Sequence, residues 1–416
     1  RYAASTFRRL GHARSLVAAG SLLALGCSGQ IDAPNGSGDD GPAPLGGRGG
    51  SGARAGNGGG GGAGGADDPT QLPASDFVSS PGLRRLTRTE YAHTVADLLG
   101  VDVAAGELPR ELIIGGHSQI AGAQKTGYED TNSFVTNGEK IADAAAARLV
   151  TEAKCADAAC WKTWAQGFLL RAFRSPPATA LLDRYTAVLT STDAGATANE
   201  RMGTFLTAVL SSPHFLYRKE IGTAGADPAL RTLTPYEIAT RLSYLVWQSG
   251  PDGALLTNAS SLTDANQRGT QLDRLLGDPK ARRGLRAFTA DWMAIFDNKI
   301  PQKAPEVLAG TGTSFAQVAQ QGFDLFVDDV LGATSPRFSD LLSADYAFAN
   351  ADLAKVLGAT PPASGFAKVT LDTRQRRGLL THPLVVAAHS KESGASPFLL
   401  GEFIYAAYND SVIEDE

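Results

Sequence analysis

With 416 residues the chain can hold two or three domains of ordinary size, and its apolar share of 43% is enough to bury a sizeable core. Its formal charge is −5, and it has no basic block comparable to the positive stripe with which nucleic-acid-binding proteins displace counterions. We therefore do not expect nucleic acid as a main ligand.

The first 27 residues are arranged like an export leader. Arg8, Arg9 and Arg14 form a positive start, and residues 16–25 (LVAAGSLLAL) form an uncharged stretch. Ten apolar residues are too few to cross about 30 Å of hydrocarbon as a helix. We therefore interpret the segment as a signal peptide and not as a permanent membrane span.

Cys27 ends this leader in a context that resembles a lipobox. Gly26 precedes it and Ser28 follows it, although Ala24 stands where Leu is usual. In a lipobox the thiol is diacylated and becomes the new N-terminus, so we expect a lipid anchor at Cys27. A plain secretory signal with a chance cysteine is the alternative. Loss of the leader and its four arginines takes the formal charge from −5 to −9.

Residues 28–66 are dominated by glycine, with 17 Gly among Ser, Ala, Pro, Asn and Asp. This composition cannot bury apolar surface and behaves as a flexible coil, whose length gives a reach on the order of 35 Å. We expect a disordered linker over residues 28–82 that holds a folded body near a membrane and leaves it free to reorient.

Two further cysteines lie close together in the phrase CADAAC, at Cys155 and Cys160. In an oxidising compartment this spacing predicts a short local disulfide at the start of the next helix. We expect no metal site here, because no His or third Cys lies nearby in the sequence. A Cys-x-x-Cys-His motif does not occur, so we expect no covalently attached haem and no other cofactor.

Helix signals recur along the rest of the chain. Thr87 and Glu90 form a capping box in which each group can bond the backbone of the other, and Gly100 supplies a stop. Thr234 and Glu237 repeat the device, with Pro235 at the first helical position. Two similar helix starts can result from a distant duplication or from two independent capping boxes, and independent boxes are the simpler interpretation.

Further amphipathic stretches are separated by loops rich in Pro and Gly. They predict helices at about 137–152, 161–173, 178–189, 200–210, 264–276, 279–295, 315–331 and 376–388. Strand signals are nearly absent. The pattern predicts an all-α fold, a multi-helix array that follows the disordered linker.

Seven phrases, taken together, carry a resemblance to a known family. They are LTRTEYAHTVADLLG (86–100), GYEDTNSF (127–134), CWKTWAQGFLLRAFRSP (160–176), LSSPHFLYRKE (210–220), LTPYEIATRLSYLVWQSGPDGALL (233–256), SADYAFANADLAKVLG (343–358) and RRGLLTHPLVVAAHS (376–390). In this order they resemble secreted planctomycete and myxobacterial proteins built from consecutive helical domains of unknown function, the 1587, 1595, 1592 and 1588 series. In that family these domains are often associated with a planctomycete-type c cytochrome.

The resemblance covers roughly residues 83–398 and implies export and a helical fold, but no established reaction. We expect helical domains at 83–155, 156–225 and 226–360, and a fourth helical segment at 361–416. The cytochrome module has no counterpart here. The family usually continues past Ser396-Pro397 with a basic phrase, whereas this chain ends in an acidic tail, so we expect the fourth segment to be truncated.

The most informative local cluster is the phrase SPHFLYR, which contains His214 and Arg218. A histidine held by proline and aromatic residues can line a polar pocket, and Arg241, Trp247 and Asp252 are further candidates for its wall. The more economical interpretation is a helix end and internal ion pairs, because Arg is well suited to bidentate pairing.

Three metal-type patterns are weaker than their structural alternatives. Glu90 and His93 share a helix face, but a carboxylate bundle needs a second Glu-x-x-His. His382 and His389 lie seven residues apart and suit a metal or haem only if Pro383 leaves one helix intact. The segment at 128–132 is rich in oxygen ligands, yet it lacks the spacing of an EF-hand, so a turn and helix cap is the better interpretation.

We therefore expect an exported, lipid-anchored helical protein in the periplasm or at the outer membrane or cell surface. Its expected role is that of a binding or scaffold component that works with other exported proteins, such as a c-type cytochrome or another envelope protein. The alternative is a secreted enzyme, redox-active or polysaccharide-active, that uses a pocket lined by Arg and His.

Overall fold

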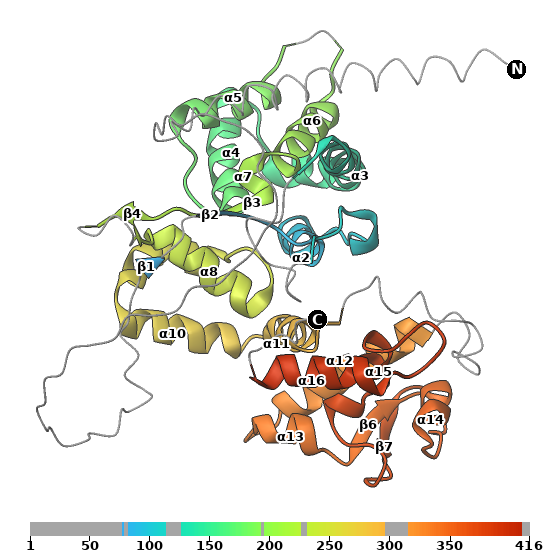
Figure 1. Cartoon of the computed structure of the whole chain (residues 1–416). Coiled ribbons are helices and arrows are strands. Elements are labelled where there is room, and N and C mark those ends of the chain that lie inside the picture. Colours follow the sequence, from blue (N-terminus) through green and yellow to red (C-terminus); the bar gives the residue numbers. More distant parts are fainter. Residues whose placement is uncertain are drawn as a thin grey trace, which may run out of the picture.

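The computed structural model describes residues 77–78, 82–113, 126–192, 195–225, 231–295 and 315–409. Most of these residues are helical, and the strands among them are short, so the predicted all-α class is confirmed (Figure 1). The leader, Cys27 and the glycine-rich segment lie outside the described residues.

The N-terminal part of the body packs around one large hydrophobic core, whose buried side chains include Tyr91, Phe168 and Phe205. Helices α3 and α6 make the most extensive contact in this part of the chain. The helices that supply this core are α2 (Arg88–Leu99), α3 (Tyr128–Ala153), α4 (Ala158–Phe173), α5 (Thr179–Leu189), α6 (Ala198–Leu210) and α7 (Pro213–Leu216).

Helix α2 begins at the predicted capping box. The Glu90 amide donates to Thr87 Oγ1 at 3.1 Å, and the Thr87 amide donates to Glu90 Oε2 at 2.9 Å. Gly100 ends the helix with φ of 64°, a left-handed conformation that glycine adopts without steric cost. The local sequence alone thus fixes both ends of α2.

Helix α8 (Pro235–Trp247) repeats this beginning, with Thr234 as its cap. The Glu237 carboxylate accepts the Thr234 amide at 2.8 Å and also the amides of Ile221 and Gly222 at 2.9 and 3.1 Å. Both capping glutamates are buried, so each also fastens its helix to the rest of the body.

Helix α8 starts a second, smaller core with α9 (Gly253–Thr257), α10 (Ala265–Leu276) and α11 (Ala281–Trp292). Helices α8 and α11 approach very closely at Gly284. A Cβ atom at this position would lie 2.4 Å from the carbonyl oxygen of Val246 and 2.7 Å from that of Leu245. The crossing therefore requires a residue without a side chain.

The C-terminal part has a third core around Phe323 and Phe326 of α12 (Phe315–Leu331). In Figure 1 this part lies below the other two, and α11 lies beside α12. Its remaining elements are α13 (Phe338–Ser343), β6 (Tyr346–Ala349), α14 (Ala351–Leu357), β7 (Ala367–Thr370), α15 (Pro383–Ala388) and α16 (Pro397–Asn409).

Three small antiparallel sheets supplement the helices, although the sequence shows few strand signals. In one, β2 (Gly82–Arg85) pairs with β3 (Tyr217–Glu220), and β6 pairs with β7 in another. The third has the order β1-β5-β4, formed by β1 (Phe77–Val78), β5 (Arg231–Thr232) and β4 (Thr223–Ala224). The β2–β3 pair joins the start of the body to the segment after α7.

Two predicted helix boundaries are wrong. Helix α3 begins at Tyr128, nine residues before the expected start, because the Asp130 carboxylate accepts the Gly127 amide at 3.1 Å and caps the helix there. The predicted helix at 376–388 is instead a 3₁₀ turn, Leu379–Thr381, followed by α15. Pro383 separates the two, since it cannot continue a helix from the preceding turn.

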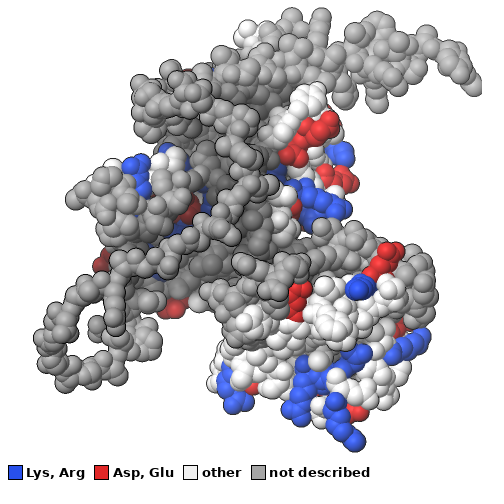
Figure 2. Space-filling model, viewed as in Figure 1, with Lys and Arg blue, Asp and Glu red and all other residues white. Residues whose placement is uncertain are grey.

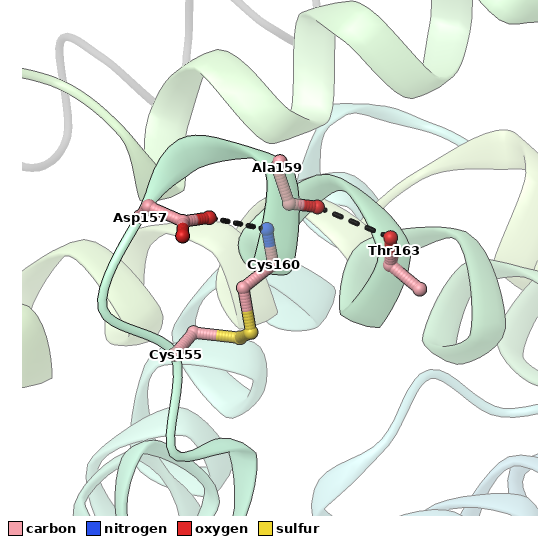
Figure 3. The surroundings of a disulfide bond; sticks show 5 residues. All are labelled: Cys155, Asp157, Ala159, Cys160 and Thr163. Carbon is pink, nitrogen blue, oxygen red and sulfur yellow. Dashed lines mark hydrogen bonds between the residues drawn. A yellow bond between two sulfur atoms is a disulfide. The ribbon is translucent and has the colours of Figure 1, made fainter.

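The predicted disulfide between Cys155 and Cys160 is present, with a Cα–Cα distance of 5.3 Å (Figure 3). Between the two cysteines, Asp157 caps α4, and its Oδ1 accepts the Cys160 amide at 2.8 Å. The disulfide therefore closes the loop that leads into α4, as the sequence predicts.

Candidate ligand cavity

The five residues expected to line one pocket lie in three separate places of the structure. Arg218 is buried, and its Nη1 lies 3.2 Å from Glu90 Oε1, while its guanidinium stacks 4.9 Å from the centre of the Tyr244 ring. Arg241 is half-exposed and approaches Glu220 at 4.0 Å. These two arginines thus belong to one ionic cluster between the β2–β3 pair and helices α2 and α8.

Trp247 and Asp252 form a second group with Arg274. The Trp247 indole donates to the Leu275 carbonyl at 2.9 Å, and Asp252 caps α9 through the Leu255 amide at 2.8 Å. The Arg274 guanidinium lies 2.9 Å from Asp252 and 5.7 Å from the Trp247 ring. This group anchors α9 and α10 to the end of α8.

His214 lies apart from both groups, exposed in the first turn of α7, where Ser212 Oγ accepts its amide at 3.2 Å. Its ring packs 5.3 Å from that of Phe173. Burial of part of the ring and the nearby charges of Lys219 and Arg174 lower its pKa. Among the described residues, no hydrogen bond, ion pair or ring contact joins His214 to the other four candidates.

A different cavity, which we call cavity A, lies where the start of α2 meets α11 and α12. Its volume is about 360 Å³, which falls in the range of about 300–1,000 Å³ that is usual for small-molecule sites. Its charged and polar lining residues are Thr87, Arg88, Thr89, His93, Arg110, Glu111, Gln248, Arg283, Arg286, Asp291, Gln320 and Asp324.

Helix α11 supplies two of the arginines, and carboxylates hold both in place. Arg286 makes two bonds to Asp328, from Nε at 2.9 Å and from Nη2 at 2.5 Å, and lies 3.7 Å from Asp324. Arg283 donates to Asp97 of α2 at 2.9 Å. These pairs tie α11 to α12 on one side and to α2 on the other, so the wall of the cavity is built from three helices.

The segment after the 3₁₀ turn at Ala105–Glu107 supplies the opposite wall. Glu111 accepts the Arg88 amide at 2.5 Å and lies 3.5 Å from Arg88 Nε, so its carboxylate rests on the N-terminus of α2. Arg85 of β2 donates to the Arg110 carbonyl at 3.0 Å. The exposed Arg110 side chain has no partner among the described residues.

Three titratable groups in cavity A, His93, Asp324 and Arg286, have shifted pKa values, and the hydrogen bonds to Asp328 raise that of Arg286. Burial, reinforced by the positive charge of Arg283, lowers the pKa of His93, so its ring is neutral at neutral pH. Its Nδ1 atom is buried and has no hydrogen-bond partner among the described residues. Burial raises the pKa of Asp324, an effect that Arg286 and a hydrogen bond from Gln320 oppose.

A second hollow, cavity B, has a volume of about 830 Å³ and lies over the end of α12, α13 and β6. Three of its four acids are paired: Asp329 accepts from Lys368 and from the Tyr346 hydroxyl, both at 2.8 Å, Asp328 pairs with Arg286, and Asp340 pairs with Arg337. Figure 2 shows Lys and Arg side chains along the lower edge of this C-terminal part, with acidic groups among them. Cavity A differs from cavity B because it holds a buried histidine nitrogen, His93 Nδ1, and an arginine side chain, Arg110, that have no hydrogen-bond partner among the described residues.

The histidines of the metal-type patterns make structural hydrogen bonds. His382 caps α15, where its Nδ1 accepts the Leu384 amide at 3.2 Å, and His389 bonds the Met293 carbonyl through Nε2 at 2.8 Å. The Glu90 carboxylate accepts the Thr87 amide in the capping box of α2 and pairs with Arg218. The described part of the chain contains no group of three or more His, Cys, Asp or Glu that could hold a metal ion.

Sequence reasoning missed cavity A. In the sequence, His93 stands out only beside Glu90, where a capping glutamate with a surface histidine is the better interpretation, and no pattern marks Arg88, Arg110, Arg283 or Arg286 as pocket residues. The one available signal was the concentration of arginines in KARRGLR, at 280–286. This signal does not show that residues almost 200 positions earlier form the facing wall.

Comparisons with known proteins find three family models in this chain. They are PSD3 (DUF1587) at residues 84–147, PSD5 (DUF1595) at 160–220 and PSD4 (DUF1592) at 233–359, each described as a protein of unknown function. The expected series of consecutive domains of unknown function is confirmed for these three. No curated protein and no solved structure is significantly similar to the chain. No helix in the described residues is both long and apolar enough to cross a membrane.

Proposed function

We propose that this chain of three consecutive domains is an exported, lipid-anchored binding or scaffold component of the cell envelope. Its place is the periplasm or the outer membrane or cell surface, and it works with other exported proteins there, such as a c-type cytochrome or another envelope protein. Cavity A is its binding site.

The observation that carries this proposal is the disulfide between Cys155 and Cys160. Disulfides form and persist in oxidising compartments and are rare in the reducing cytosol. The sequence before the body agrees with this placement, because a short apolar leader ends at Cys27 and a glycine-rich segment follows it. These three features support our proposal of a body that works outside the cytoplasm at the end of a tether.

Cavity A supports the binding role. Its walls come from α2, α11, α12 and the segment at 110–113, and carboxylates fix the arginines of α11. A cavity with a rigid polar wall needs little reorganisation when a ligand enters, and this lowers the cost of binding. The site therefore suits capture of a ligand by preformed groups.

The test is to express the full chain with its leader in a bacterium that processes lipoproteins, and to fractionate the cells. We expect the protein in the membrane fraction, and we expect Cys27→Ser to release it, because the acylated thiol is absent. The double change of Cys155 and Cys160 to Ser is the matched control and should leave the membrane association unchanged. Equal membrane association of wild type and Cys27→Ser would contradict the anchor.

One observation favours the alternative, a secreted polysaccharide-active enzyme. Cavity A contains a histidine whose pKa burial lowers and a carboxyl group whose pKa burial raises, so a candidate base and a candidate acid line the same cavity. Turnover of a polysaccharide by the purified full chain, lost in His93→Gln and kept in His214→Gln, would favour the enzyme over the binding component.

A further inference from the structure

We propose that cavity A binds a neutral, polyhydroxylated ligand of the saccharide class. This inference deepens the proposed function and rests on it in one respect, since it names what the binding component captures.

The charges of cavity A nearly cancel. Four arginines face three acids in its lining, and the arginines of α11 are further neutralised by acids behind them. Asp97 pairs with Arg283 at 2.9 Å, and Asp328 pairs with Arg286 at 2.5 Å. An anion or a cation would therefore gain little from a net field here, and a neutral ligand avoids the cost of desolvating an unpaired charge.

The lining groups are mostly planar and polar, and they include both donors and acceptors. Arg110 offers a fork of N–H donors without a described partner. Gln248 and Gln320 each donate one amide N–H within the body, to the Tyr244 carbonyl at 2.8 Å and to Asp324 at 2.9 Å, and each also has an amide oxygen. The carboxylates of Glu111 and Asp324 can accept further hydrogen bonds beside those from Arg88 and Gln320. A hydroxyl donates one hydrogen bond and accepts two. Neighbouring hydroxyls of a sugar ring can therefore bond a guanidinium, an amide and a carboxylate at the same time, which a purely apolar or purely ionic ligand cannot do.

The wall that bears Arg110 is held from both sides. Arg85 donates to the Arg110 carbonyl at 3.0 Å, and Glu111 accepts the Arg88 amide at 2.5 Å. The backbone is thus fixed, while the Arg110 side chain is exposed. Removal of this side chain leaves no described group without its partner, so it tests binding without disturbing the fold.

The experiment measures binding to the purified full chain by calorimetry and ligand-observed NMR. The neutral probes are glucose, maltose, cellobiose and N,N′-diacetylchitobiose, and the charged probes are galacturonate and sulfate. We expect at least one neutral saccharide to bind with an affinity that changes little between low and high salt, because screening acts on net charge.

Arg110→Ala should weaken this binding by about tenfold or more, as expected for the loss of hydrogen bonds from a charged donor. Gln320→Ala should weaken it as well. Arg374→Ala is the matched control, since this side chain is 93% exposed and does not line the cavity. We expect the control to bind as the wild type does.

Three results would overturn the saccharide site. They are binding of the charged probes alone, no binding of any neutral probe, and equal affinity of Arg110→Ala, Gln320→Ala and wild type for the bound saccharide. The lipid anchor is tested separately by fractionation. A chain that is acylated but binds no saccharide refutes this inference alone, and a chain that binds saccharide without acylation refutes the anchor alone.

Discussion

Glu90 combines two roles that are usually carried by separate residues. Its Oε2 closes the capping box of α2, and its Oε1 lies 3.2 Å from Arg218, with none of the residue exposed to solvent. The same carboxylate therefore begins a helix and compensates a buried cation. Loss of one member of a buried ion pair is costly, because it leaves the other charge uncompensated.

We expect Glu90→Ala to lower the free energy of unfolding by about 3–5 kcal/mol. Glu200 closes the exposed capping box of α6 and is the matched control, for which a loss of about 1 kcal/mol is expected. Urea denaturation of the two variants measures the difference. Similar losses for the two variants would show that the pair with Arg218 adds nothing to the cap.

His382 makes the free energy of unfolding depend on pH. Burial lowers its pKa to about 3, and the positive charge of Arg376 adds to this effect. The unfolded chain binds a proton near the ordinary pKa of about 6.5, whereas the folded chain does not. The stability contributed by neutral His382 is therefore complete above about pH 6.5 and is lost as the pH falls towards 3, by up to about 1.4 kcal/mol per pH unit.

The measurement is the free energy of unfolding between pH 7 and pH 4 for wild type and for His382→Asn. Asparagine keeps a side-chain acceptor for the cap of α15 and does not titrate, so we expect a flatter pH dependence in the variant. A variant whose stability falls with pH as steeply as that of wild type would rule out His382 as the source.

At the scale of elements, the sequence predicts those helices whose ends carry their own signals. Helix α8 begins at its predicted capping box, and α12 spans the predicted residues, 315–331. The start of α3 was wrong because its cap combines a glycine backbone with Asp130, a pattern less distinctive than Thr-x-x-Glu. The strands were missed because each has only two to four residues and pairs with a distant segment.

The cavity could not be predicted for a related reason. Its lining residues come from separate stretches of sequence, at 87–93, 110–113, 248, 283–295 and 320–324, and only the packing of α2 against α11 and α12 brings them together. The predicted pocket residues lie closer in sequence, yet the fold uses most of them for ion pairs and caps. Residue type indicated polar chemistry correctly but did not show which arginines remain near a cavity.

Helices α8 and α11 cross at Gly284, where a side chain would clash with the backbone of α8. Gly284→Ala places a methyl group within 2.4 Å of a backbone oxygen of α8, which must move, so we expect a loss of about 1–3 kcal/mol and a lower melting temperature. Gly269→Ala, in α10, meets no atom within 4 Å and should stabilise the protein by up to about 1 kcal/mol through helix propensity. Thermal unfolding compares the two, and a stable Gly284→Ala would contradict the close crossing.

At the scale of the whole molecule, the body has three packed cores, and α11 contacts elements of all three. Gly284 brings this helix against α8, Arg283 pairs with α2, and Arg286 pairs with α12. Cavity A lies at this junction, so ligand contacts and contacts between cores share the same helix. Ahead of this body we propose a glycine-rich tether and a lipid at Cys27, which hold the binding site close to a membrane surface.

The most direct test of an exported, anchored body is the intact mass of the mature protein from its native membrane, alkylated without prior reduction. We predict a chain that begins at Cys27, carries the mass of the lipid and has no alkyl group on Cys155 or Cys160. A chain that retains an unmodified leader and is alkylated at both of these cysteines would contradict the account.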